Sequence, residues 1–133
     1  MEKIIVTGGL GFIGSNLAKR LSQQKEMHNI VIMDSLIKDY GANLFNIKGF
    51  EDKVKVNFSD LRDPFSLKAI LEDVDIIYNL AAQIGHSHSM QSPIEDLDIN
   101  AKGQLNLLES IKEICPKLHQ IWQIVPKLSR KKM

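Results

Sequence analysis

The sequence predicts an α/β fold, an open and doubly wound parallel sheet of about four strands with flanking helices. Three observations lead to this fold class. Strand-like and helix-like segments alternate along residues 3–114. The strand-like segments are nearly continuous apolar runs, which suit a parallel sheet that is covered on both faces. A glycine-rich turn joins the first strand directly to the first helix.

Four segments have the length and composition of strands, and they are residues 4–6, 29–33, 54–58 and 75–80. The second is the clearest, because Ile30–Met33 contains no polar side chain. Right-handed crossovers between successive strands predict the sheet order 3-2-1-4.

Helical spacing of apolar residues predicts three helices. The first follows the glycine turn and carries Ile13, Leu17 and Leu21 on one face. The second begins at Pro64, with Asp63 as its cap, and the third begins at Pro93. Ser92 and Glu95 form a capping box there, and the helix runs to about residue 114 with the apolar stripe Ile94, Leu97, Ala101, Leu105 and Leu108. We expect residues 34–49 to be a loop with one helical turn at 44–47.

The turn between the first strand and the first helix has glycines three residues apart, at Gly8, Gly11 and Gly14. This pattern predicts a dinucleotide site: Gly8 permits the tight turn, Gly11 a close approach of pyrophosphate, and Gly14 close packing of the helix. The helix N-terminus, with Phe12 and Ile13, offers free N–H groups to phosphates. The alternative is a turn that is merely tight.

Thr7–Gly14 resembles the TGGxGFIG signature of the extended short-chain dehydrogenase/reductase family. Its members include NAD-dependent nucleotide-sugar epimerases and dehydratases. Three later segments match the family in order, and they are residues 31–36, 58–63 and 78–83, the last followed by a matching helix stretch at 100–109. The resemblance covers about residues 1–116 and implies a Rossmann-type domain with NAD as cofactor. The fold we expect is therefore a truncated version of the family's sheet, with 1–116 as a partial NAD-binding domain.

Asp34 ends the second strand, 20 residues after Gly14. That spacing suits a carboxylate that accepts hydrogen bonds from the adenosine ribose, and its charge favours NAD over NADP, although Lys38 lies close in sequence. The alternative for Asp34 is a solvated turn residue. The resemblance further implies that Asp60 and Leu61 contact adenine, and that Ala81 and Ala82 lie beside the nicotinamide-side ribose.

Two polar features of the later sequence are less specific. His86 and His88 lie in a polar segment that we expect to be a loop, on the substrate side by resemblance or simply solvated, and their spacing is poor for a metal. Asn100 by resemblance faces the active site and supports a polar network. The alternative for Asn100 is a surface position.

The family's catalytic Tyr-x-x-x-Lys pair has no match here. The chain has two tyrosines, Tyr40 and Tyr78, and Leu44 and Ala82 stand four residues after them. We therefore predict the NAD-binding portion of an epimerase or dehydratase, an isomerase-type family, with no catalytic residue of its own. A non-catalytic nucleotide-binding module and an inert gene remnant are the alternatives, so whether the chain is an enzyme stays open.

Composition is ordinary, with 44% hydrophobic residues and a formal net charge of +1. No apolar run of bilayer length or signal-peptide core is present, and a single cysteine, Cys115, fits a reducing compartment, so we expect a cytoplasmic protein. The expected partner is a nucleotide sugar in the intact family, with no membrane or nucleic acid.

Residues 117–133 read as a separate, atypical tail with five basic and no acidic side chains. A solvated terminus is the plain interpretation, and an anion-binding tail the alternative. Within it, residues 120–125 have strand propensity. They are expected either to dock beside the fourth strand with Trp122 packed, or to leave an open edge through which the chain self-associates.

Overall fold

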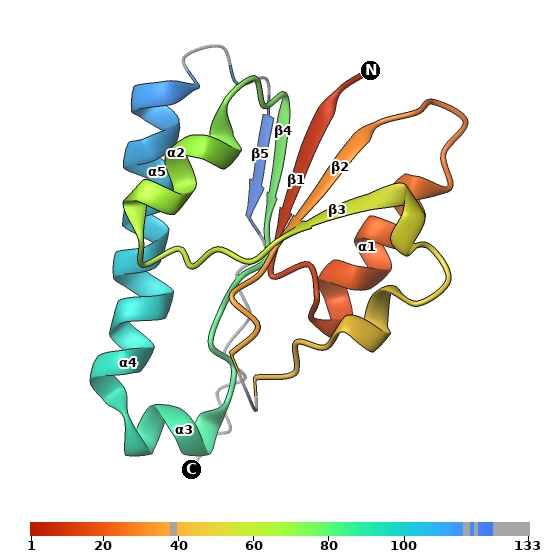
Figure 1. The fold of residues 1–133 in the computed structure, drawn as a ribbon. Helices are drawn as coiled ribbons and strands as arrows, with labels where there is room; N and C mark the ends of the chain where they lie inside the picture. The colour runs from red at the N-terminus through yellow and green to blue at the C-terminus, as the bar shows by residue number, and fades with distance from the viewer. Residues whose placement is uncertain (38–39, 116–117, 119, 124–133) are drawn as a thin grey trace.

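The fold is a five-stranded parallel sheet in the order β3-β2-β1-β4-β5 (Figure 1). It is seen in a computed structural model that describes residues 1–37, 40–115, 118 and 120–123. The strands are β1 (Lys3–Thr7), β2 (Asn29–Met33), β3 (Val54–Asn57), β4 (Ile76–Asn79) and β5 (Gln120–Gln123). The predicted order of the first four strands is confirmed, and a fifth strand is added.

Helices cover both faces of the sheet, as a doubly wound fold requires (Figure 1). On one face lie α1 (Phe12–Ser22) and the 3₁₀ helix η1 (Leu44–Ile47). On the other lie α2 (Pro64–Leu71) and α5 (Gly103–Ile114). A second 3₁₀ helix, η2 (Glu51–Lys53), precedes β3, and three short segments lead from β4 to α5: α3 (His86–Gln91), α4 (Pro93–Leu97) and the π-helical η3 (Asp98–Lys102).

Side chains alternate between two cores along each central strand. In β1, Ile4 and Val6 pack toward α1, whereas Ile5 packs toward α2 and α5. In β4, Ile77 joins the second core and is fully buried. Burial on both faces explains why these strands are apolar without interruption.

The two predicted proline-led helices begin differently. Asp63 caps α2 as predicted, since its Oδ1 accepts from the Phe65 N–H at 3.0 Å. The capping box at Ser92 is wrong, because the Ser92 side chain makes no cap hydrogen bond. Ser92 instead ends α3, where its N–H donates to the carbonyl of His88 at 2.8 Å. The segment containing His86 and His88 is thus a helix rather than the expected loop.

The apolar stripe predicted for residues 94–108 lies largely in solvent. Ile94, Leu97 and Leu105 are 71%, 59% and 57% exposed. The face of α5 that packs inward carries Gly103, Leu107 and Ser110. The helix is not continuous, because η3 inserts a wider π-helical turn between α4 and α5 and shifts the register of the faces.

Residues 120–123, part of the predicted segment 120–125, dock beside β4 as a substitute strand, which is one of the two outcomes expected from the sequence. All four side chains of β5 are exposed, however, and Trp122 is 55% exposed, so the expected packing of Trp122 is wrong. Lys38, Ile124, Val125 and the basic residues of the tail lie outside the described residues. Among the helices that the structure describes, none has the length and apolar character needed to cross a bilayer.

Candidate functional site

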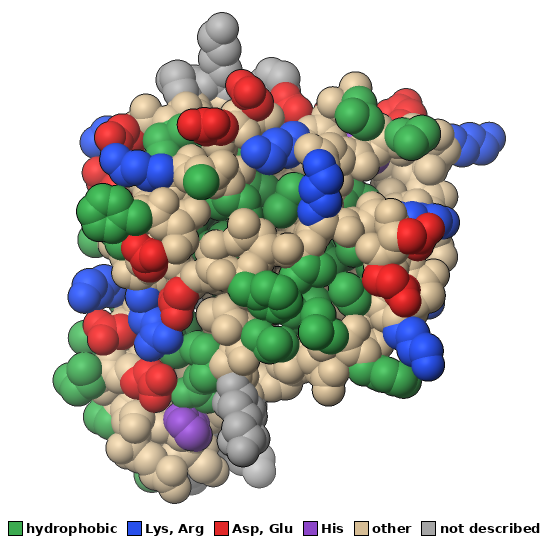
Figure 2. All heavy atoms as spheres, in the orientation of Figure 1, with side chains coloured by type: hydrophobic (Ala, Val, Ile, Leu, Met, Phe, Trp, Pro, Cys, Tyr) green, Lys and Arg blue, Asp and Glu red, His purple; other side chains and the backbone are tan. Residues whose placement is uncertain are grey.

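A cavity of about 520 Å³ opens at the carboxyl ends of the central strands. It lies where the chain order of the strands reverses between β1 and β4, the place where open α/β sheets bind ligands. Figure 2 shows hydrophobic side chains gathered on this face, below the strand ends and between the α1 side and the α2–α5 side. Every residue predicted to bind the cofactor lines the cavity: Gly8, Gly11, Phe12, Ile13, Gly14, Asp34, Asp60, Leu61, Ala81 and Ala82.

The glycine turn is too tight for side chains at two of its three spaced glycines, Gly8 and Gly14. Gly8 has φ +64°, and a Cβ there would lie 2.9 Å from the Ala81 Cα. A Cβ on Gly14 would lie 2.3 Å from the Gly8 carbonyl oxygen. Gly11 caps α1 with extended backbone and no side-chain hydrogen bond. The first turn of α1 therefore presents its N–H groups to the cavity, as an anion site requires.

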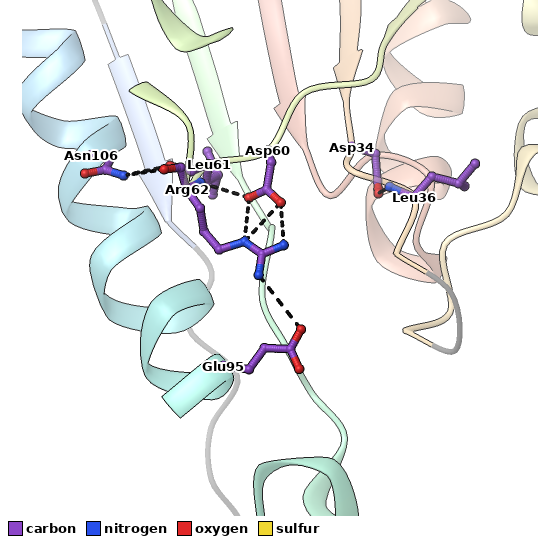
Figure 3. Close-up of polar contacts among 7 residues, drawn as sticks. All are labelled: Asp34, Leu36, Asp60, Leu61, Arg62, Glu95 and Asn106. Atoms are coloured by element: carbon purple, nitrogen blue, oxygen red, sulfur yellow. Dashed lines mark hydrogen bonds and ion pairs between the residues drawn. The ribbon is translucent and has the colours of Figure 1, made fainter. Parts of the chain in front are cut away.

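Asp34 ties the glycine turn to the loop after β2. Asp34 is buried, and its carboxylate accepts from the Leu10 N–H at 3.0 Å. It also accepts from the Leu36 N–H at 2.9 Å (Figure 3). A carboxylate has about four acceptor positions, so these two bonds leave capacity for hydroxyl donors. Asp34 is therefore more than the solvated turn residue of the alternative interpretation.

Asp60 lies in a turn after β3 and is paired with Arg62 (Figure 3). Burial alone would raise the pKa of Asp60, but hydrogen bonds from the Arg62 side chain and backbone outweigh it and hold that pKa below its usual value. Asp60 thus remains a charged acceptor at the wall of the cavity.

Helix α5 fixes the same turn from behind. The Asn106 side-chain amide donates to the carbonyls of Leu61 and Arg62, at 3.1 Å and 3.2 Å. Gly103 lets the helix approach, since a Cβ there would lie 3.1 Å from the Leu61 Cβ. Sequence reasoning missed both residues, because a helical Asn or Gly carries no local signal of the turn that it meets.

A polar network of hydrogen bonds holds the end of β4 close to the glycine turn. The Thr7 hydroxyl donates to the Asn79 Oδ1 at 2.7 Å and accepts from the Leu80 and Ala81 N–H groups at 3.0 Å and 3.1 Å. Gln104 completes the network, since it accepts from the Asn79 amide at 2.5 Å and donates to the Ala81 carbonyl at 2.9 Å. Ala81 is thereby held so close to Gly8 that a Cβ on Gly8 would clash with the Ala81 backbone.

Asn100 is exposed and does not itself line the cavity, in line with the surface alternative, but its side chain joins a polar network beside the cavity. Its Oδ1 accepts from the Gln83 N–H at 2.8 Å, and its Nδ2 donates to the Gln83 carbonyl at 3.0 Å. Gln83 lines the cavity, so Asn100 positions the wall from η3. His88, by contrast, belongs to no group of three potential metal ligands among the described residues.

Tyr40 lines the cavity and was not singled out as a binding residue from the sequence. Its ring meets the His88 ring edge-on, with centroids 5.0 Å apart. Burial and the negative charge of Glu95 raise the pKa of the Tyr40 phenol. Its neighbours come from α3 and α4, far along the chain, so no local pattern identifies it.

Comparison with known proteins identifies close counterparts of this architecture. The family described as GDP-mannose 4,6 dehydratase matches residues 5–124, past Pro116 and through β5. Protein CapI of Staphylococcus aureus is 37% identical over 116 residues, covering 80% of this chain and 33% of that protein. The dTDP-L-rhamnose 4-epimerase of Burkholderia thailandensis is 31% identical, covering 83% and 30%.

Among solved structures, dTDP-glucose 4,6-dehydratase from Bacillus anthracis in complex with NAD superposes with a TM-score of 0.77 at 31% identity. The similarity covers 92% of this chain and 37% of that one. The chain spans about a third of the length of the curated relatives that it matches. The resemblance seen in the sequence is thus confirmed: the chain belongs to the GDP-mannose 4,6 dehydratase family of nucleotide-sugar epimerases and dehydratases.

Proposed function

We propose that this chain binds NAD in the cavity at the strand ends, as the cofactor-binding portion of a nucleotide-sugar epimerase or dehydratase. One observation carries the proposal: all ten residues that the sequence assigns to the cofactor line a single cavity. The NAD named for the B. anthracis relative supports the same ligand.

The residues present fit the adenosine diphosphate half of the cofactor. The uncapped start of α1 faces the pyrophosphate, and Gly11 leaves room for its approach. Asp34 accepts from the adenosine ribose hydroxyls, and a 2′-phosphate there would meet its charge, which favours NAD over NADP. Asp60 and Leu61 contact adenine, while Ala81 and Ala82 lie beside the second ribose.

We further propose that the chain alone does not turn over a nucleotide sugar. By resemblance to the family, NAD held by this cavity would supply the hydride acceptor for a sugar carbon, and a tyrosine with a lowered pKa would be needed to move the proton. Tyr40 is the tyrosine that lines the cavity, and its pKa is raised rather than lowered. It also lacks a lysine four residues later, where Leu44 stands.

Calorimetric titration with NAD, NADP and ADP tests the binding proposal. NAD and ADP are expected to bind with similar affinity, because the contacts are on the adenosine side, and NADP more weakly. Asp34→Asn should reduce the difference in affinity between NAD and NADP, because it removes the charge that the 2′-phosphate would meet. Binding of none of the three would favour the inert gene remnant, and NAD far tighter than ADP would reveal a nicotinamide-side contact.

Turnover assays with nucleotide sugars test the second proposal. General acid–base help is worth about 10²–10⁴-fold, so its loss leaves rates far below those of enzymes. Product formation at enzyme-like rates, retained after removal of host proteins, would refute it.

A further inference from the structure

We infer that Arg62 is a positioning residue for the nucleotide base: it orients the Asp60 carboxylate beside the Leu61 N–H and so sets a preference for adenine over hypoxanthine. The inference rests on the proposed function, since it assigns a further residue to the same cavity. Arg62 itself does not line the cavity, so its effect passes through Asp60.

The guanidinium and backbone of Arg62 together fix both carboxylate oxygens of Asp60 (Figure 3). Oδ1 accepts from the Arg62 N–H at 2.8 Å and from Nε at 3.0 Å. Oδ2 accepts from Nε at 3.0 Å and from Nη2 at 2.6 Å. These four bonds come from three N–H groups, because the Nε–H is shared between the two oxygens. A carboxylate has about four acceptor positions, so three donors leave one position for a further donor.

Arg62 is itself held from two other elements. Its Nη1 lies 3.8 Å from the Glu95 Oε1 of α4, so the guanidinium lies between two carboxylates (Figure 3). Asn106 of α5 holds the carbonyl of Arg62 at 3.2 Å. The side chain is 34% exposed, yet its direction is set at both ends. Because Arg62 is held at its guanidinium and at its backbone, it also restricts rotation of the Asp60 carboxylate.

The next peptide group supplies the complementary donor. Leu61 lines the cavity, its carbonyl is bound by Asn106, and its N–H has no acceptor among the described residues. One acceptor beside one donor matches adenine, which offers an amino group beside a ring nitrogen. Hypoxanthine offers a carbonyl oxygen and a ring N–H instead, so its oxygen would meet the Asp60 charge.

The experiment measures the affinities of ADP and inosine diphosphate for four forms of the chain by calorimetry. The forms are wild type, Arg62→Met, Arg62→Lys and the control Lys68→Ala, which removes a solvent-exposed pair with Glu113 outside the cavity. Wild type and the control should favour ADP. Arg62→Met should reduce the ADP preference roughly tenfold, the value of a hydrogen bond to a charged group.

Arg62→Lys should recover part of the preference, because it keeps the charge without the paired geometry. A parallel loss of affinity for both nucleotides in Arg62→Met would overturn the inference, since a purely structural role acts on both alike. An unchanged ratio would also overturn it, and if Arg62→Met fails to fold, the Lys variant decides. Wild type that binds ADP and inosine diphosphate equally refutes the base preference alone, whereas wild type that binds neither refutes the proposed function too.

Discussion

Strands β1 and β5 pair with opposite sides of the same strand and differ in almost everything else. Each lies parallel to β4 and is aligned with residues 76–79. Ile4, Ile5 and Val6 of β1 are at most 2% exposed, whereas Ile121 and Trp122 of β5 are 40% and 55% exposed. Hydrogen bonding therefore places both strands, but helices cover only one of them. Because burial is the larger stabilising contribution, β1 should hold the fold and β5 should add little.

The candidate site is formed at the end of the buried strand β1 and not at the exposed strand β5. β1 ends at Thr7, which joins the buried network behind the cavity and runs into the glycine turn. No described residue of β5 lines the cavity. The candidate site thus depends on the best-packed part of the fold, and changes at the β5 edge should leave nucleotide binding largely intact.

Ile77 and Ile121 test the comparison most directly, because they are register partners in adjacent strands. Ile77→Ala should lower the free energy of unfolding by about 2–5 kcal/mol, since the side chain is fully buried. Ile121→Ala should cost less than about 1 kcal/mol, in line with its exposure. Urea unfolding measures both, and equal losses would mean that β5 is as well packed as the centre.

Gly14→Ala should be the next largest change, about 1–3 kcal/mol with loss of ADP binding. The new Cβ would meet the Gly8 carbonyl oxygen and the Gly9 Cα, and backbone atoms cannot move aside as a flexible side chain could. Gly11→Ala is the matched control for stability, because a Cβ on Gly11 would come no closer to another atom than 3.2 Å, the distance to the Gly8 carbonyl oxygen. Comparable stability of the two variants would contradict the crowding seen at Gly14.

Thr7→Val should cost about 1–2 kcal/mol, because the hydroxyl serves three partners and the variant keeps the shape. The Leu80 and Ala81 N–H groups would lose their acceptor, so the end of β4 should loosen against Gly8. Amide hydrogen exchange at residues 80–81 measures this loosening, with residues 30–32 of β2 as the internal control. Unchanged exchange at both places would mean that the hydroxyl is dispensable.

Local patterns predicted the glycine turn, the order of four strands and the Asp63 cap, because each depends on neighbours a few residues away. Local patterns could not predict the pairing of Arg62 with Glu95 or of Asn106 with Leu61, since those partners meet only when α4 and α5 pack against the turn that follows β3. The π-helical turn of η3 shifts the helix faces, so the apolar stripe at Ile94 and Leu97 is exposed to solvent. Helical spacing alone does not reveal such an inserted turn. Strand propensity predicted the docking of residues 120–123 but carried no information about what covers them.

Substitution of Trp122 should have the smallest effect on stability, and the fluorescence of Trp122 reports directly on the sheet edge formed by β5. Its indole N–H donates to the Gln120 side chain at 3.1 Å, and the ring is 55% exposed. Trp122→Ala should change the free energy of unfolding by no more than about 0.5 kcal/mol, as at other surface positions. As the chain's one tryptophan, it also reports its own surroundings, so its fluorescence should be red-shifted and readily quenched by acrylamide.

A blue-shifted, protected Trp122 would mean that β5 is covered in solution, and dilution identifies what covers it. If protection is lost on dilution while far-UV circular dichroism is unchanged, a second copy pairs with the edge, because unpaired strands are templates for association. If protection persists at every concentration, the cover belongs to the same chain, and the contrast between β1 and β5 is smaller than their exposures indicate. Ile121→Lys separates the two cases further, since a charge on the edge should abolish pairing between copies while costing the monomer little.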